Sequence, residues 1–114
     1  GVIKRTIEIS RQAAHLSVRH DQLVVQPMGE TKTAAATIPC EDIGVVIVDH
    51  PAATYSHQAL AALMHHGAAV VVCGRDHLPG GVLLPMSSHH EVLWRVNEQI
   101  AATAPAKKRV WQQI

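Results

Sequence analysis

The fold is decided by one stretch, residues 43–73, which reads IGVVIVDHPAATYSHQALAALMHHGAAVVVC. Its two nearly continuous apolar runs, 43–48 and 69–73, have the pattern of strands that are covered on both faces. Between them, Ser56 can cap a helix that continues to about His66, where a glycine follows as the stop signal. A strand, a helix of about eleven residues and a second strand predict a crossover that sets the two strands parallel.

The chain before this stretch carries further strand signals. Residues 3–10 alternate between apolar and polar side chains, which is the pattern of a half-buried strand. Residues 15–26 alternate on both sides of His20-Asp21, and this arrangement predicts a hairpin with the dipeptide as its turn. Residues 31–38 predict another strand, weakened by its alanines.

After the second apolar run, a polar loop at residues 74–77 leads to a Pro-Gly-Gly turn at 79–81 and a last short strand at 82–84. These elements place the chain in the α+β class. We expect a small β-rich domain over residues 1–86, with hairpins and one β-α-β crossover.

A helical tail is expected over residues 87–114. Ser88 and Glu91 form a capping-box pattern just ahead of an apolar run. Apolar residues then recur at helical spacing: Leu93, Val96 and Ile100. A break at 103–105 precedes a second helix, whose apolar stripe at Val110, Trp111 and Ile114 stops with the chain. Because such a stripe needs a partner face, we expect a piece of a longer protein, with a linker helix leading into a missing helical domain.

Composition narrows the class of protein. The chain has 114 residues, which suits one domain, and 47% of them are hydrophobic although Phe is absent. No apolar run approaches the ~20 residues that span a bilayer, and no signal-peptide pattern opens the chain. We therefore expect a soluble, cytoplasmic protein without a membrane partner. In that compartment Cys40 and Cys73 are expected as buried thiols rather than as a disulfide.

Nine histidines raise the hypothesis of a metal site. Their spacing does not support it, because the adjacent His65 and His66 diverge by about a hundred degrees on a helix. Cys73 and His77 lie four residues apart and can meet across a loop, yet two ligands do not make a structural zinc site. No nucleophile with a positioned base is found either. We therefore predict no catalytic residue and no metal ligand within this chain.

Cationic side chains remain as candidates for phosphate contacts. Residues 1–86 carry six Lys/Arg and seven Asp/Glu, a balance of −1, whereas residues 87–114 carry four and two, a balance of +2. The candidates are Lys4, Arg5, Arg75, His77, Lys107, Lys108 and Arg109. For the run at 107–109 a solvated helix face is the alternative, and it stays open.

Three segments carry a resemblance to a known family: 38–49 (IPCEDIGVVIVD), 55–60 (YSHQAL) and 66–79 (HGAAVVVCGRDHLP). They show, in order, a proline before an acidic connection, a buried strand, a Ser-His helix start, a glycine, a second buried strand and a Cys-x-x-x-His loop. In this order and spacing the chain resembles the CRISPR-associated spacer-acquisition integrases, particularly their type II form. The resemblance covers essentially the whole chain, although no single motif in it is catalytic or diagnostic alone.

The resemblance implies an N-terminal β domain joined to a larger helical domain. The family's metal ligands, a Glu, a His and an acidic residue, belong to the helical domain, so none maps onto this chain. For the intact protein it implies a metal-dependent DNA endonuclease and integrase, with magnesium or manganese as cofactor, that inserts new spacers into CRISPR arrays in antiviral defence. It also implies a homodimer, a small CRISPR-associated partner protein and double-stranded DNA, with the isolated fragment inactive.

Under this resemblance Arg75 and His77 are the favoured DNA contacts, followed by Lys107, Lys108 and Arg109. Two other functions stay open. The near-neutral β part and exposed strand edges favour a pure homodimerisation module without DNA contact. A histidine-rich metal-binding domain ranks last.

Overall fold

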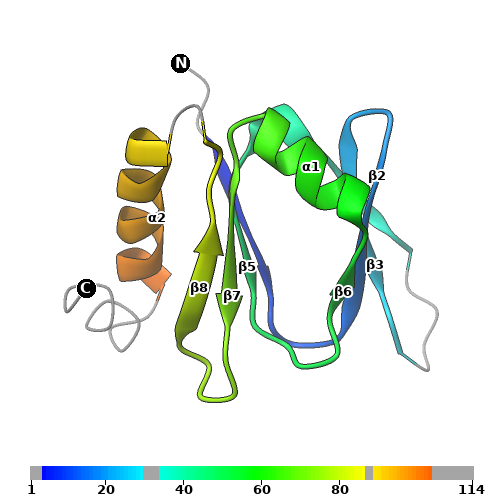
Figure 1. The fold of residues 1–114 in the computed structure, drawn as a ribbon. Coiled ribbons are helices and arrows are strands. Elements are labelled where there is room, and N and C mark those ends of the chain that lie inside the picture. The colour runs from blue at the N-terminus through cyan, green and yellow to red at the C-terminus, as the bar shows by residue number, and fades with distance from the viewer. Residues whose placement is uncertain (1–3, 30–33, 87–88, 104–114) are drawn as a thin grey trace.

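The computed structural model describes residues 4–29, 34–86 and 89–103 of the chain. Within these ranges, two four-stranded sheets pack around a shared core. Helix α1 (His57–His65) lies across one end of the space between the sheets, and helix α2 (His89–Thr103) covers the outer face of one of them (Figure 1). The α+β class predicted from the sequence is confirmed.

The strands of the first sheet, in spatial order, are β1 (Arg5–Ile9), β5 (Ile43–Val48), β7 (Ala69–Cys73) and β8 (Pro79–Leu83). The strands of the second sheet are β4 (Ala36–Pro39), β3 (Gln22–Pro27), β2 (Ala14–Arg19) and β6 (Thr54–Tyr55). A short 3-10 turn, η1 (Cys40–Asp42), connects β4 to β5. Helix α2 follows β8.

The predicted β-α-β crossover is confirmed. Strands β5 and β7 are parallel neighbours, in register from Val45 opposite Ala69 to Val48 opposite Val72. Every residue of β5 is buried, as expected for a strand with both faces covered. The hydroxyl oxygen of Ser56 accepts the N–H of Ala59 at 3.1 Å, and this cap starts α1 where the sequence predicted it.

Alternation along the parallel strands divides the apolar side chains between two cores. The inner core lies between the sheets and α1. The outer core lies between the first sheet and α2, and its buried side chains are Val45, Ile47, Ala69, Val71, Val92, Val96 and Ile100. The helix was expected to present Leu93 with Val96 and Ile100, and that is wrong for Leu93, which is only half-buried. Val92 takes its place because positions 92, 96 and 100 follow one another along a single helix face.

The predicted hairpin is confirmed in β2 and β3. His20 and Asp21 form its two-residue turn, with φ of 52° and 58°. Positive φ at both central residues is the signature of a type I′ turn, whose twist matches that of the strands. The carbonyl of Asp21 also accepts the N–H of Cys40 at 3.0 Å, which ties the turn to the start of the first sheet.

The Pro-Gly-Gly turn expected at 79–81 is wrong, because these residues begin β8. They pair with the end of β7, Gly81 opposite Val72 and Pro79 opposite Cys73. Proline is tolerated there because β8 is an edge strand, which needs no donor on its open side. The predicted polar loop at 74–77, together with Leu78, makes the turn instead.

Two expectations about the chain's environment can be compared with the structure. Neither Cys40 nor Cys73 forms a disulfide; Cys40 is buried as predicted, whereas Cys73, also expected to be buried, is half-buried at the end of β7. Among the described residues no helix is both long and apolar enough to cross a membrane.

Candidate nucleic-acid interface

The parallel arrangement of β5 and β7 brings two polar segments to one edge of the first sheet. Residues 49–51 follow β5, and residues 74–77 follow β7, so both leave the carboxyl ends of adjacent strands. They surround a hollow of about 370 Å³, called here the carboxyl-edge pocket, which is lined by Asp49, His50, Pro51, Cys73, Gly74, Arg75 and His77. In Figure 1 the β7–β8 loop, which supplies part of this lining, protrudes at the end of the sheet away from α1.

An imidazole–carboxylate pair forms one wall of the pocket. Nδ1 of His77 lies 3.0 Å from Oδ1 of Asp49. The Asp49 side chain is 9% exposed, whereas that of His77 is 71% exposed. Because a carboxylate only accepts hydrogen bonds, Nδ1–H of His77 is the donor. The other ring nitrogen, Nε2, is then left for an external partner.

The β7–β8 loop holds His77 in a defined backbone position. The N–H of His77 donates to the carbonyl of Gly74 at 3.0 Å, and the N–H of Gly74 donates to the carbonyl of Leu78 at 2.9 Å. His77 has a φ of 63°, in the left-handed region that costs a non-glycine residue about 1 kcal/mol. The carboxylate of Asp76 accepts the N–H of Leu78 at 3.1 Å, which closes the loop further.

His50 contributes a second, differently arranged imidazole. Its Nδ1 accepts the backbone N–H of Ala52 at 3.1 Å, so this nitrogen carries no proton. Neutral His50 therefore bears its proton on Nε2, which is a donor. Arg75 is exposed at the rim. The pocket thus combines a permanent cation, an N–H donor and an imidazole whose second nitrogen is available.

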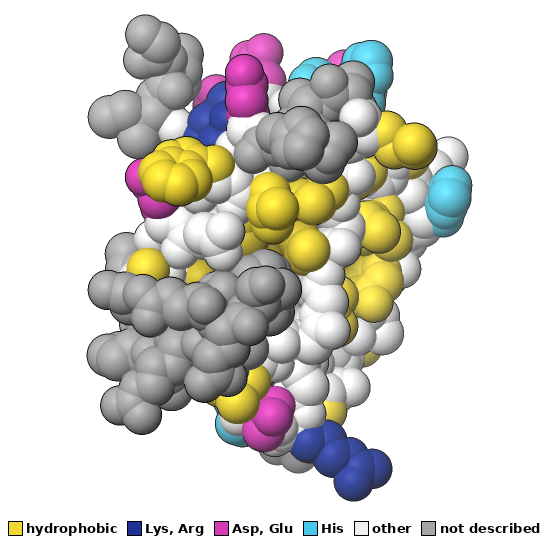
Figure 2. Space-filling model, turned by 60° about the vertical axis from the view of Figure 1, so that its left-hand side comes forward, with side chains coloured by type: hydrophobic (Ala, Val, Ile, Leu, Met, Phe, Trp, Pro, Cys, Tyr) yellow, Lys and Arg dark blue, Asp and Glu magenta, His cyan; other side chains and the backbone are white. Residues whose placement is uncertain are grey.

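The structure brings together only part of the predicted cationic set. Arg75 and His77 share the carboxyl-edge pocket. Arg5 pairs with Ile43 at the start of β5. The carboxyl-edge pocket lies at the other end of that strand, about 17 Å away over five residues of extended chain. Lys4 precedes Arg5, and its Nζ donates to the carbonyl of Glu41. Figure 2 shows Lys and Arg atoms at both ends of the visible face rather than in one patch.

Lys107, Lys108 and Arg109 lie outside the described residues, as do the second predicted helix and Ser88 of the capping box. Asp49 and His50 were not predicted as site residues. The sequence did contain a signal for them, because polar residues directly after a buried parallel strand lie at the edge where such sheets bind ligands.

The metal-site hypothesis finds no geometric support in ranges 4–29, 34–86 and 89–103, where no three His, Cys, Asp or Glu side chains are placed to hold an ion. The rings of His65 and His66 stand edge to face, with centroids 5.1 Å apart.

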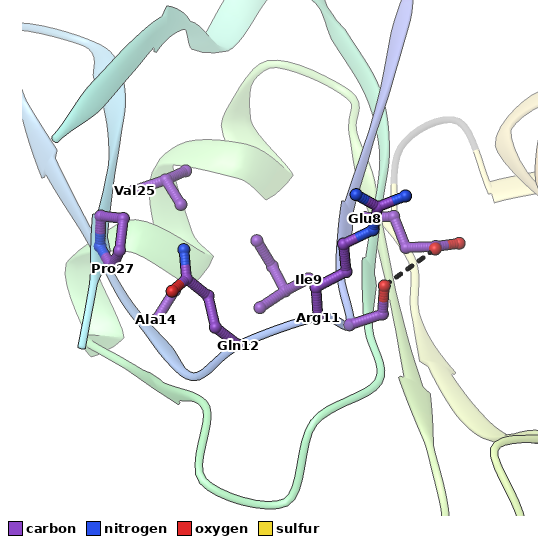
Figure 3. A pocket seen from close by; sticks show the side chains of 8 residues that line it. Glu8, Ile9, Arg11, Gln12, Ala14, Val25 and Pro27 are labelled. Carbon is purple, nitrogen blue, oxygen red and sulfur yellow. Dashed lines mark hydrogen bonds between the residues drawn. The ribbon is translucent and has the colours of Figure 1, made fainter. Parts of the chain in front are cut away.

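A second hollow, of about 300 Å³, opens where the two sheets separate beyond β1 (Figure 3). Its floor is apolar: Ile9, Ala14, Val25 and Pro27. Gln12 points into the opening, and the hydroxyl of Ser10 donates to Glu8 at 3.1 Å on the rim. No pair of catalytic groups faces this opening among the eight residues that line it.

A third hollow, of about 230 Å³, is an apolar groove between β8 and the start of α1. It is lined by Tyr55, Leu60, Val70, Val72, Gly81, Val82 and Leu83. Tyr55, Val72 and Leu83 are 41%, 42% and 44% exposed. A band of hydrophobic side chains is visible on this side of the molecule in Figure 2. The groove exists because the second sheet faces β1 and β5 and leaves the inner face of β8 uncovered.

Two sheets, a β-α-β crossover and two helices define a small α+β domain. The sequence profile of the family described as CRISPR associated protein Cas1 matches residues 7–112, so the chain belongs to the Cas1 family. The family suggested by the sequence resemblance is thereby confirmed.

Individual relatives agree. The chain is 35% identical over 99 residues to the CRISPR-associated endonuclease Cas1 of Neisseria meningitidis serogroup C (strain 8013). That alignment covers 87% of this chain and 31% of the relative, so the chain spans about a third of the relative's length.

Solved structures show the same fold. A TtCas1–DNA complex superposes with a TM-score of 0.61 at 14% identity, covering 74% of this chain and 30% of that one. A partial Cas6-RT-Cas1–Cas2 complex gives a TM-score of 0.61 at 17% identity, covering 71% of this chain and 23% of that one.

Proposed function

We propose that this chain is the N-terminal dimerisation and DNA-positioning domain of a metal-dependent DNA endonuclease/integrase that inserts new spacers into CRISPR arrays. The observation that carries the DNA contact is the carboxyl-edge pocket, where Arg75, His77 and His50 converge. Family membership supports the reaction class, since the matched Neisseria relative is named an endonuclease. In this proposal residues 1–86 form the β domain and residues 87–114 lead into a helical domain.

The pocket suits a phosphodiester group. Arg75 supplies a guanidinium cation, and the Nε2–H of His50 supplies a directed donor. Contacts of this kind hold the DNA backbone without reading its sequence, which is what positioning a foreign fragment of arbitrary sequence requires. Lys107, Lys108 and Arg109 would extend the same electrostatic contact.

In the intact protein a 3′-hydroxyl would attack a phosphodiester, and bound magnesium or manganese would stabilise the attacking and leaving oxygens. The family's metal ligands would come from the helical domain, so this chain contributes positioning rather than chemistry. The partners we propose are duplex DNA, a small CRISPR-associated protein and a second copy of the chain, meeting in the cytoplasm. Solved relatives titled as Cas1–DNA and Cas1–Cas2 complexes support the first two.

The apolar groove favours dimerisation as the second part of this function. Strand β8 is the edge of the first sheet, so its outer backbone groups are unpaired within the sheet. A second copy that adds its own β8 in antiparallel register, about a two-fold axis, would pair these groups and place its own side chains beside Leu83. If dimerisation is the whole function, the β8 edges would pair in the same way and the carboxyl-edge pocket would not contact DNA.

Charge reversal at Arg75 distinguishes a DNA-positioning domain from a module that only dimerises. We expect Arg75→Glu to weaken binding of a short duplex about tenfold at about 50 mM salt and to lower the slope of log affinity against log salt by about one. Arg19→Glu is the matched control, because Arg19 is an equally exposed cation on the second sheet. Fluorescence anisotropy with the chain and with the full-length protein measures both. Equal affinities and slopes for the two variants would leave the dimerisation module as the function.

A further inference from the structure

Asp49 is the one acidic side chain that is buried among the described residues. Burial of a carboxylate is unfavourable unless its oxygens are hydrogen-bonded. Its contact to Nδ1 of His77 joins this buried group to a residue in a left-handed backbone conformation. A hydrogen-bonded buried carboxylate that holds the exposed ring of a residue with positive φ points to a functional role for that contact rather than to packing alone.

The hydrogen bond decides which nitrogen of His77 faces a ligand. In the neutral ring, Nδ1–H donates to Asp49, so Nε2 presents a lone pair. A lone pair repels the oxygens of a phosphate group, which are also acceptors. Once Nε2 gains a proton it becomes a charged donor, and the carboxylate of Asp49 balances the imidazolium from behind.

We propose that Asp49 is a positioning residue that makes His77 a proton-coupled phosphate ligand: binding of a DNA phosphodiester in the carboxyl-edge pocket is accompanied by uptake of one proton at Nε2 of His77. This proposal rests on the DNA contact proposed above for the same pocket. It adds to that contact a specific protonation step and the residue that controls it.

The other groups around His77 do not supply this proton step. From the end of β5, His50 already accepts the N–H of Ala52 at Nδ1, so a second proton on His50 would break that bond. From the β7–β8 loop, Arg75 remains charged, and Asp76 accepts the N–H of Leu78. The thiol of Cys73 lines the pocket from the end of β7. His77 is therefore the group that can change from an acceptor to a donor while keeping its contact to Asp49.

The first test is the pH dependence of duplex binding by the full chain, from about pH 5.5 to about pH 8. We expect the affinity to fall as the pH rises through this range, approaching a limit of about tenfold per pH unit, because one proton is bound with the DNA. His77→Asn should remove this dependence. His57→Asn, at an exposed position of α1, is the matched control and should retain it. Asp49→Asn should lower the affinity at neutral pH to the level of His77→Asn.

The second test reads the tautomer directly. The ¹⁵N chemical shifts of the His77 ring in the unmodified chain at about pH 8 should report a proton on Nδ1. A proton on Nε2 instead would overturn the role of Asp49 without any variant that must fold. A pH-independent affinity, with the Arg75→Glu loss intact, overturns proton coupling and keeps the DNA contact. If Arg75→Glu has no effect, the DNA contact fails and the proton-coupled ligand fails with it.

Discussion

Gly44 is the residue whose substitution tests the packing of the first sheet most directly. The register between β1 and β5 shifts at this point, with Arg5 opposite Ile43 and Thr6 opposite Val45, so Gly44 is the extra residue of a bulge. A Cβ added there would lie 2.9 Å from Cβ of Lys4 and 3.0 Å from Cδ of Arg95. We therefore predict that Gly44→Ala destabilises the chain.

The magnitude follows from which atoms must move. Cδ of Arg95 belongs to a flexible side chain, but Cβ of Lys4 moves only with its backbone, so β1 must shift away from β5. Overpacking of this kind costs about 1–3 kcal/mol. Replacing glycine with alanine stabilises by about 0.4–1 kcal/mol through the unfolded state. The net expectation is a loss of about 1–2 kcal/mol in the free energy of unfolding.

Urea denaturation followed by circular dichroism measures this loss. Gly81→Ala is the matched control, since Gly81 lies in β8 of the same sheet and a Cβ there meets nothing within 4 Å. That variant should match or slightly exceed the wild-type stability. The packing argument fails if Gly44→Ala unfolds at the same urea concentration as Gly81→Ala.

Three further substitutions or treatments test other parts of the structure. Ile100→Ala should lower the free energy of unfolding by about 3 kcal/mol, because Ile100 is fully buried against the first sheet. Its control is Trp94→Ala, at a side chain that is 68% exposed, which should change that free energy by no more than about 0.5 kcal/mol. Urea denaturation compares the two variants. Ser56→Ala should cost about 1 kcal/mol through loss of the α1 cap, and Ser56→Asp should restore most of it. Burial, and secondarily the charge of Asp21, raises the pKa of the Cys40 thiol above its ordinary value of 9.0. Cys40 should therefore resist alkylation by iodoacetamide in the native state, as read by mass spectrometry. The Cys40 thiol of the folded state therefore keeps its proton to higher pH than that of the unfolded state. The stability contributed by the neutral thiol should be present below about pH 9 and be lost as the pH rises above it.

Local sequence patterns were sufficient to predict those elements whose structure depends only on residues a few positions apart. The run from Ile43 to Val48 is apolar on both faces, so its burial in the middle of a sheet follows from composition alone. The His20-Asp21 turn follows in the same way from the alternation on each side of it. Both features depend on neighbours a few residues away.

Apart from the β-α-β crossover, pairing between distant segments could not be read from the sequence. Strand β1 lies beside β5 although more than thirty residues separate them, and no local pattern specifies that partner. Strand β8 begins at Pro79, because an edge strand accepts the proline and two glycines that locally favour a turn. On α2, the choice of Val92 over Leu93 depends on how the helix is rotated against the sheet, which the helical period alone leaves open.

The role of the candidate site stays a prediction, and the sequence specified its geometry only in part. The polar composition of the β7–β8 loop was enough to single out Arg75 and His77. Asp49 was not assigned to the same site. The predicted parallel pairing of β5 and β7 brings the ends of both strands to one edge, but the contact to His77 also depends on the conformation of the β7–β8 loop. A residue that acts through a neighbour 28 positions away becomes visible only once the sheet is assembled.

The two proposed surfaces are physically connected, since the loop that carries Arg75 and His77 runs directly into β8. Pairing of β8 with its copy would therefore fix the relative placement of two carboxyl-edge pockets, and each dimer would hold a duplex at two points. Leu83→Glu places a charge in the exposed apolar groove and should shift the chain toward monomer in sedimentation equilibrium. The same variant should weaken duplex binding through loss of the second contact, whereas Arg75→Glu should weaken binding and leave the dimer intact. Monomeric Leu83→Glu that binds duplex as tightly as the wild type would show that the pockets act independently.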